Sequence, residues 1–172
     1  MRRSSKIRIV AVGAAVGAVM ACGIAVRGTD AASVSANLSV TVSVTVNCTV
    51  TTSPLAFGSY DPVVAHATTA LNGTGLVTVA CTKGAAPTVG LGLGSNASGS
   101  TRRMTDGSGN FLTYEIYTDN GRTTVWGGAT VVSLGAAPSK TGRDTTAYGR
   151  VAAGQDVPAG SYSDSVTATV NF

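Results

Sequence analysis

The sequence predicts an all-β protein, an antiparallel sandwich or barrel, and three observations carry this prediction. From residue 33 onward apolar and polar residues alternate with a period of two, and no segment shows the 3.6-residue period of a helix. Short runs rich in Val, Thr and aromatic residues are separated by frequent Gly, Asn and Asp turn signals. Only 12% of the 172 residues are charged, which argues against a helical bundle or a coiled coil.

The expected elements can be followed in order along the chain. Strands are predicted at residues 43–50, 76–81, 89–94, 111–117 and 163–172. Turns are predicted at residues 72–73, 95–100, 106–110, 119–121, 127–128 and 158–160. Gly90, Gly92 and Gly94 alternate with apolar residues, which indicates a strand that another backbone or a large aromatic side chain approaches closely. The length fits one domain, and we find no linker or long repeat.

The formal net charge of +4 does not indicate nucleic-acid binding, because its source is the N-terminal region. Five basic residues precede residue 33, and from there to the end seven Lys and Arg balance seven Asp and Glu. A protein that binds phosphates needs a basic surface, which this balance does not supply. The composition therefore excludes a nucleic-acid partner.

Residues 1–32 are predicted to be a secretory signal peptide. A basic cluster, MRRSSKIR, precedes an apolar run over residues 9–26, and small residues follow at Ala31, Ala32 and Ser33. Two alternatives stay open: the run is just long enough for a transmembrane anchor, and Cys22 could carry a lipid. The signal peptide fits best, because Ala and Gly dominate the run and a small-residue cleavage site ends it.

Export determines how the cysteines are interpreted. Cys22 leaves with the signal peptide, and Cys48 and Cys81 remain as a pair in an oxidising compartment, where a disulfide is the default. The bridge would close a loop of about 34 residues and stabilise the fold by roughly 4 kcal/mol in the chain-entropy treatment. A zinc site would need more ligands than these two cysteines and the distant His66.

Residues 33–50 carry the longest alternation. One parity is Ser, Asn and Thr, and the apolar parity is Val34, Ala36, Leu38, Val40, Val42, Val44 and Val46. Fully extended, residues 34–46 would span roughly 43 Å, whereas typical strands cover about 17–20 Å. We therefore divide the segment. Residues 43–50 belong to the first strand of a domain over residues 43–172, and residues 33–42 project beyond it.

An uncharged, β-prone strand that projects from its domain is an aggregation template unless another surface covers it. In one interpretation residues 33–42 fold back and complete the chain's own sheet. In the other they add as a strand to an open sheet edge of a neighbouring molecule. The final strand favours the second interpretation, because it runs to Phe172 and nothing follows it to complete the sandwich. A molecule with one strand missing and one to spare is expected to assemble head to tail.

An ordered set of short motifs follows Cys48. The set is Phe57-Gly58, Arg103-Met104, Leu112-x-Tyr114-x-Ile116-Tyr117-x-Asp119, Trp126-Gly127, Tyr148-Gly149-Arg150, Gly154-Gln155 and Gly160-x-Tyr162-x-Asp164-x-Val166. With these motifs, residues 48–172 resemble the spore coat protein U domain, which is also the subunit domain of archaic chaperone–usher pili. One departure is Ala152, in a loop where the family pattern has Pro.

The resemblance implies an incomplete immunoglobulin-like antiparallel sandwich that is exported to the cell surface through a periplasmic chaperone and an outer-membrane usher. It also implies that subunits of a pilus or spore-coat layer polymerise by donor-strand complementation, the N-terminal extension of one filling the groove of the next. The implied donor side chains are Val34, Ala36, Leu38, Val40 and Val42. The implied lining of the acceptor groove, which also faces the chaperone, is Val166, Ala168, Val170 and Phe172.

No catalytic set, cofactor site or metal site is predicted, and an enzyme is not expected. His66 is expected in a loop, without the oriented Ser and carboxylate of a serine hydrolase. Residues 106–110 have too few acids for a good calcium site. Trp126, Tyr114 and Tyr117 could form a sugar-binding platform, so a monomeric secreted adhesin or glycan-binding module is the alternative function. Packing of these aromatic rings in the core is the favoured interpretation.

Overall fold

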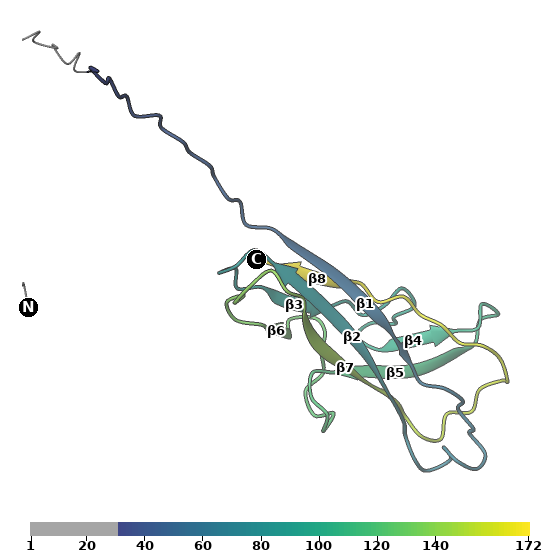
Figure 1. Cartoon of the computed structure of the whole chain (residues 1–172). Helices are drawn as coiled ribbons and strands as arrows, with labels where there is room; N and C mark the ends of the chain where they lie inside the picture. The colour runs from purple at the N-terminus through teal and green to yellow at the C-terminus, as the bar shows by residue number, and fades with distance from the viewer. Residues whose placement is uncertain (1–30) are drawn as a thin grey trace, which may run out of the picture. The chain divides into compact units, whose positions relative to one another are not determined.

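Residues 31–172 are described by a computed structural model, and all of their regular structure is β (Figure 1). No helix among these residues is long and apolar enough to cross a membrane. The predicted signal peptide, except for its last two residues, and Cys22 lie outside this part of the chain. The strands are β1 (Cys48–Ala56), β2 (Leu71–Cys81), β3 (Thr88–Leu91), β4 (Arg102–Thr105), β5 (Phe111–Tyr117), β6 (Val131–Ser133), β7 (Arg143–Val151) and β8 (Ala168–Asn171).

The strands form two sheets that pack face to face. The larger sheet has the order β1-β2-β7-β5-β4 and the smaller has the order β6-β3-β8. All pairs of neighbouring strands are antiparallel. Buried side chains from both sheets, among them Val79 of β2, Val89 of β3 and Ile116 of β5, make one core. The predicted immunoglobulin-like antiparallel sandwich is confirmed.

Alternation with a period of two explains why these segments bury one face. In β5 the side chains of Leu112, Tyr114 and Ile116 are buried, and the residues between them are half-buried. Successive side chains of a strand point to opposite faces, so apolar residues at every second position line a single face. The strands predicted at residues 76–81 and 111–117 are confirmed, the first as the second half of β2.

Three predicted strands have wrong boundaries. The strand predicted at residues 89–94 is β3, Thr88–Leu91, and it ends three residues early. The first strand starts at Cys48 instead of residue 43, because its partner β2 ends at Cys81, directly opposite Cys48. The last strand is only Ala168–Asn171 instead of residues 163–172. Residues 163–167 bond first to β4 and then to the segment that follows β3, so they do not form one regular ladder.

The turn predicted at residues 72–73 is also wrong, because both residues lie inside β2 and pair with β7. Gly73 serves a different purpose. A Cβ atom on this residue would lie 2.8 Å from the carbonyl oxygen of Ala56, at the end of β1. The glycine therefore marks a close approach of two strands and not a reversal of the chain.

Residues 31–47 contain no strand, and their side chains are exposed. The chain divides into two compact units between Thr41 and Val42. The described part of the first unit, residues 31–41, has no regular structure, and the second unit holds all eight strands. The predicted donor segment thus falls almost entirely in the first unit.

Candidate functional site

A groove runs along the sandwich between β1 and the segment that leads into β8. It consists of two cavities of about 390 and 670 Å³. The first lies between residues 52–55 and 162–168, and the second lies between residues 55–62 and 157–162. The cavities are contiguous, because both are lined by Leu55, Phe57, Met104 and Tyr162.

The two walls of the groove run in opposite directions. The first wall runs along β1 from Cys48 toward Ala56. In the same direction, the residues of the opposite wall decrease in number from Ala168 to residue 157. In Figure 1 the arrow of β8 likewise points back toward the start of β1. The groove therefore has two distinct ends: the disulfide end, where β1 starts at Cys48, and the far end, beyond Ala56.

Both walls carry strand edges with free backbone groups. Within residues 31–172, β1 pairs only with β2 and β8 pairs only with β3, and each stands at the edge of its sheet. An edge strand presents unpaired N–H and C=O groups that can hydrogen-bond to an added strand. Because β1 and β8 contact each other in this chain, a strand added along the whole of β8 has to move β1 aside.

The floor of the first cavity is the core itself. The side chains of Val77, Leu91, Ile116 and Ala147 are all buried, and all line this cavity. Apolar side chains inserted from outside would therefore join the same core, with a favourable transfer of about 25 cal/mol for each Å² of apolar surface removed from water.

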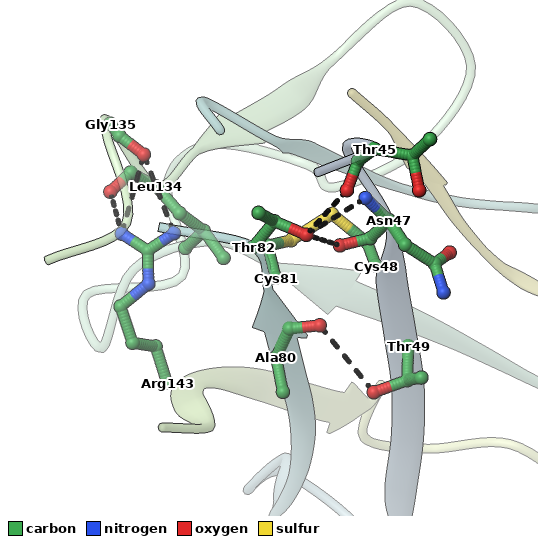
Figure 2. Close-up of a disulfide and its surroundings, with 10 residues drawn as sticks. All are labelled: Thr45, Asn47, Cys48, Thr49, Ala80, Cys81, Thr82, Leu134, Gly135 and Arg143. Carbon is green, nitrogen blue, oxygen red and sulfur yellow. Dashed lines mark hydrogen bonds between the residues drawn. A yellow bond between two sulfur atoms is a disulfide. The ribbon is translucent and has the colours of Figure 1, made fainter. Parts of the chain in front are cut away.

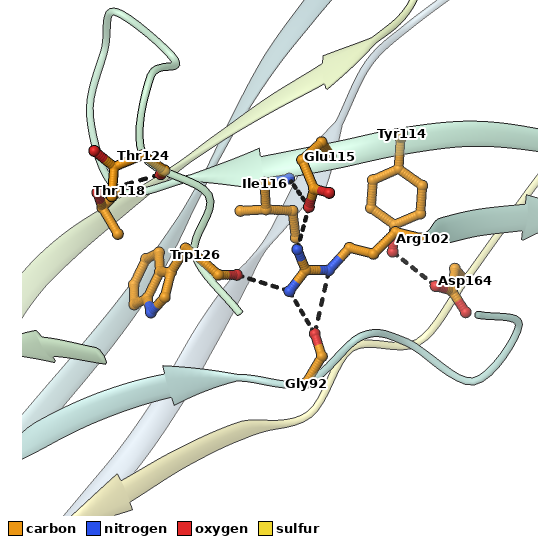
Figure 3. A network of polar contacts seen from close by, with 9 residues as sticks. All are labelled: Gly92, Arg102, Tyr114, Glu115, Ile116, Thr118, Thr124, Trp126 and Asp164. Atoms are coloured by element: carbon orange, nitrogen blue, oxygen red, sulfur yellow. Dashed lines mark hydrogen bonds and ion pairs between the residues drawn. The ribbon is translucent and has the colours of Figure 1, made fainter. Parts of the chain in front are cut away.

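A polar cluster fixes the wall opposite β1. The carboxylate of Asp164 accepts a hydrogen bond from the Tyr114 hydroxyl at 2.7 Å (Figure 3). It also accepts hydrogen bonds from the Asn96 side-chain amide at 2.9 Å and from the Asn96 backbone N–H at 3.1 Å. Gly94 makes room for it, since a Cβ atom there would lie 1.9 Å from the carboxylate. Burial and the bond to Asp164 raise the pKa of Tyr114, so its hydroxyl keeps its proton. The wall is thus tied to β5 in the larger sheet.

The predicted acceptor residues lie at different places along this wall. Val166 and Ala168 line the first cavity. Val170 is half-buried and packs against the core, closer to the disulfide end. Phe172 is 60% exposed and lines neither cavity. The structure thus brings two of the four residues into the groove.

Sequence reasoning missed the other wall and the far end of the groove. Leu55 and Phe57 from β1 and the loop after it, together with Tyr162, line both cavities. Leu55 and Phe57 lie after Cys48 and are two residues apart, a spacing that puts both side chains on one face of an extended segment and could have indicated their role. Their position beside the final strand depends on the order of strands in the sheets, and local periodicity does not predict that order.

The predicted donor side chains are all exposed. Val34, Leu38, Val40 and Val42 have exposed fractions between 84% and 97%, and Ala36 is also exposed. This series of exposed apolar side chains lies on one parity of a segment that has no regular structure. The sandwich, for its part, has a groove that reaches its core, bordered by sheet edges.

The comparisons with known proteins bear on this pair of features. The sequence pattern of the Spore Coat Protein U domain matches residues 34–169. The chain belongs to the Spore Coat Protein U domain family. Protein U of Myxococcus xanthus is 38% identical in an alignment of 127 residues, and the match covers 69% of this chain and 71% of that protein. Membership makes the chain a structural subunit and not an enzyme.

A solved structure supports the fold of this family member. The chain is similar to the chaperone–tip adhesion subunit pre-assembly complex CsuC–CsuE from the archaic chaperone-usher Csu pili of Acinetobacter baumannii, with a TM-score of 0.55 and 23% identity. That match covers 75% of this chain and 40% of the solved chain, so this chain spans less than half the length of its structural neighbour. A second match, to the E. coli Hda pilus minor tip subunit HdaB, is weaker, with a TM-score of 0.39 and 19% identity, and it covers 71% of this chain and 79% of that one.

The predicted disulfide of this family member is confirmed at one end of the groove. Cys48 and Cys81 are joined with an S–S distance of 2.02 Å, where β1 and β2 begin their pairing (Figure 2). The Thr82 hydroxyl accepts the backbone N–H of Asn47 at 3.0 Å, and the Thr82 backbone N–H donates to the Asn47 carbonyl. These bonds fix the point at which residues 31–47 leave the sandwich.

The aromatic platform of the alternative function does not exist on the surface. Trp126 is fully buried, and its ring N–H donates to the carbonyl of Val89 at 3.1 Å. Tyr114 is also buried. A ring without exposed surface cannot stack on a sugar, so core packing, the favoured interpretation of Trp126, is confirmed.

Trp126 is held in place by a buried cation (Figure 3). Arg102 is fully buried, donates to the carbonyl of Trp126 at 2.7 Å and to the carbonyl of Gly92 at 2.6 Å, and forms an ion pair with Glu115. These bonds join β4, β5, the segment after β3 and the Trp126 loop. A buried charge is tolerated only when it is paired and hydrogen-bonded in this way.

Polar residues that might have carried chemistry are used within loops. The Asp106 carboxylate accepts the backbone N–H groups of Ser108 and Asn110 and the Asn110 side-chain amide, so the predicted turn at residues 106–110 is confirmed. His66 lies in a loop as predicted, and its Nδ1 accepts the backbone N–H of Asp61. Within residues 31–172 no group of three His, Cys, Asp or Glu side chains is placed to hold a metal ion.

Proposed function

We propose that this family member is an exported subunit that polymerises by donor-strand complementation. Residues 33–42 of one copy enter the groove of a second copy, with Val34, Ala36, Leu38, Val40 and Val42 as the donor side chains. On the receiving copy, Val166 and Ala168 are the acceptor residues inside the groove, and Val170 and Phe172 extend the acceptor side toward the disulfide end. The observation that carries this proposal is the pairing, in one chain, of an exposed apolar segment with an open groove that reaches the core.

Two features of the groove fit a strand as its occupant. The first is the presence of unpaired backbone edges on both walls, which give affinity by main-chain hydrogen bonds. The second is the buried apolar floor, which accepts side chains at every second position of the inserted strand. A small-molecule site would instead need a few convergent polar groups, whereas Asp164 and Tyr114 are already bonded to each other.

The route to the surface is part of the proposal. Residues 1–32 direct the chain out of the cytoplasm and are removed. In the periplasm a chaperone covers the groove, since an open core edge would otherwise aggregate, and an outer-membrane usher passes the subunits to the surface. The Csu neighbour is a complex of a chaperone with a tip adhesion subunit before assembly, which supports a chaperone as the first partner. The product is a surface filament or coat layer.

A charge placed on either parity of the donor tests this proposal with its own matched control. Leu38→Asp puts a carboxylate where an apolar side chain has to enter the core, which is strongly unfavourable, and we expect polymerisation to be lost. Ser39→Asp places the same charge one residue further, on the parity that faces away, and we expect filaments to form. Electron microscopy and size-exclusion chromatography of the secreted protein give the readout. Equal effects of the two substitutions would contradict a strand in the groove.

A further inference from the structure

The loop over residues 61–67, called here the Asp61 loop, exposes two adjacent valines. Val63 and Val64 have exposed fractions of 80% and 77%. Single exposed apolar residues are ordinary on a protein surface, but two adjacent ones at a loop tip present a small apolar contact surface. Neither residue lines the groove.

Internal bonds hold the tip in one conformation. The Asp61 carboxylate accepts the backbone N–H of Val63 at 2.9 Å and of Val64 at 3.1 Å. The His66 backbone N–H donates to the Asp61 carbonyl at 2.8 Å, and the His66 ring stacks on Tyr60 with ring centroids 5.1 Å apart. A surface that is already ordered loses little conformational entropy when it binds.

The Asp61 loop lies at the far end of the groove. Tyr60 and Pro62, which flank Asp61, line the second cavity. The loop follows β1, which starts at the disulfide and ends at Ala56, so β1 separates it from the disulfide end. A strand lying in the groove must pass this loop if it leaves by the far end.

A second pair of exposed valines lies between the donor segment and the sandwich. Val44 and Val46 have exposed fractions of 80% and 58% and belong to no strand. They follow the last donor side chain, Val42, and precede Cys48. In an assembled pair of subunits this stretch spans the junction between the groove of one copy and the body of the next.

The direction of the inserted strand decides which end of the groove meets this junction. The extension of every copy leaves its own sandwich at the disulfide end, next to Cys48. A neighbour docked at that same end would compete with this extension for space. In an open filament each subunit donates its strand from one surface and receives the strand of a neighbour at a different surface. The inserted strand therefore leaves the groove at the far end, beside the Asp61 loop.

We infer that Val63 and Val64 of the receiving copy pack against Val44 and Val46 of the donating copy, forming a second contact outside the groove. This inference rests on the proposed function, and its partner is a second copy of the chain. Both pairs are apolar, exposed and close to the point where the two bodies meet. The contact stiffens the junction and slows the release of the donor strand.

The test uses filaments assembled from the full chain and a double-mutant cycle. Val63→Ser with Val64→Ser, Val44→Ser with Val46→Ser, and all four substitutions together are compared with the unaltered chain. We expect either pair to speed the dissociation of filaments by about tenfold or more, because apolar surface is lost from the contact. We expect the fourfold variant to dissociate no faster than either pair alone, because the contact is already broken.

Two controls separate the possible failures. Val131→Ser removes an exposed valine from β6, in the smaller sheet, and should leave dissociation unchanged; the unfolding temperature of each monomer shows that its fold is intact. If the unaltered chain does not polymerise, the proposed function fails and the junction fails with it. If the unaltered chain polymerises, two results would contradict only the inferred contact. In one, the effects of the two pairs of substitutions on the dissociation rate add up; in the other, neither pair changes the rate more than Val131→Ser does.

Discussion

Arg102 shows at the scale of one residue how the sandwich is tied together. Its guanidinium is fully buried and serves three partners: the Glu115 carboxylate and the carbonyls of Gly92 and Trp126. The three partners come from different segments, so the side chain acts as a cross-link between both sheets and the Trp126 loop. Removing it leaves buried acceptors without a donor, which costs more than the bonds themselves contribute.

We therefore expect Arg102→Ala to lower the free energy of unfolding by about 3–5 kcal/mol, as for other broken buried ion pairs. The neighbouring Arg103 is a matched control, because it is only half-buried and has no ion pair within residues 31–172: its guanidinium lies over the Phe111 ring at 4.0 Å from the ring centroid, and its Nε–H donates to the Asn96 carbonyl at 3.0 Å. Arg103→Ala should lower the same free energy by only about 1–2 kcal/mol. Urea titration followed by circular dichroism measures both, and similar losses would argue against the cross-link.

The Cys48–Cys81 bridge acts mainly on the unfolded chain. It closes a loop with a sequence separation of 33 residues, which restricts the unfolded ensemble by roughly 4 kcal/mol. We expect Cys48→Ala with Cys81→Ala to lower the free energy of unfolding by about 2–5 kcal/mol. Thermal unfolding with and without reductant measures this: reductant should lower the midpoint of the unaltered chain and leave the variant unchanged. An effect of reductant on the variant would show that the bridge is not its cause.

The Asp61 loop is an element whose order depends on one carboxylate. The backbone N–H of Val63, followed by that of Val64, holds the pKa of Asp61 below its ordinary value. A lowered folded pKa means that the carboxylate stabilises the loop above the unfolded pKa of about 3.9, and that this stabilisation is lost as pH falls through the lower folded pKa. The loop should therefore loosen in acid while the sandwich stays folded.

We expect the amide NMR signals of Val63 and Val64 to titrate with a midpoint below about 3.9. Asp61→Asn keeps an oxygen acceptor for both amides but removes the ionisation, so its loop signals should not titrate in this range. A midpoint at or above the ordinary Asp value would show that the two backbone bonds do not favour the charged form.

Local alternation predicted a strand correctly where the neighbouring strand is long enough to pair with the whole segment. It predicted the wrong boundary where the neighbouring strand ends early. The run at residues 111–117 was predictable because every second side chain enters the core. Residues 43–47 have the same alternation but no strand, since β2 has already ended opposite Cys48. Gly73 resembles a turn signal but packs against the end of β1. Period and propensity say which segments suit a sheet, and the sheet order decides where pairing stops.

The candidate site was half predictable for the same reason. The final strand suggested Val166 and Ala168, both of which line the groove. The facing wall, with Leu55 and Phe57, required knowing that β1 and β8 are edge strands placed beside each other. The polar cluster at Asp164 was out of reach, because Asn96, Tyr114 and Asp164 are far apart in the sequence and meet only in the folded sandwich.

At the scale of the whole molecule, the proposed assembly assigns one role to the groove and another to the exposed segment. The sandwich offers one edge in each sheet along a single groove. The extension offers apolar side chains on one parity and polar ones on the other, as a strand between core and solvent requires. In the proposed assembly each added copy would fill one groove and bring a new one, so growth would continue without closure.

A fusion of the donor to the other end of the chain should convert the subunit into a closed monomer. The last strand ends at the disulfide end of the groove, so a copy of residues 33–42 joined to Phe172 by a two-residue Asn-Gly turn can form a hairpin with β8. With the original residues 33–42 deleted, we expect a monomer that unfolds at least about 10 °C above the deletion variant, because Val and Leu side chains each gain roughly 1.5–3 kcal/mol on burial. Leu38→Asp in the appended copy should abolish the gain. Calorimetry measures the unfolding temperature, and size-exclusion chromatography measures the oligomeric state. If the appended strand has no effect on either, the groove does not bind this segment with residue 33 at the disulfide end and residue 42 at the far end.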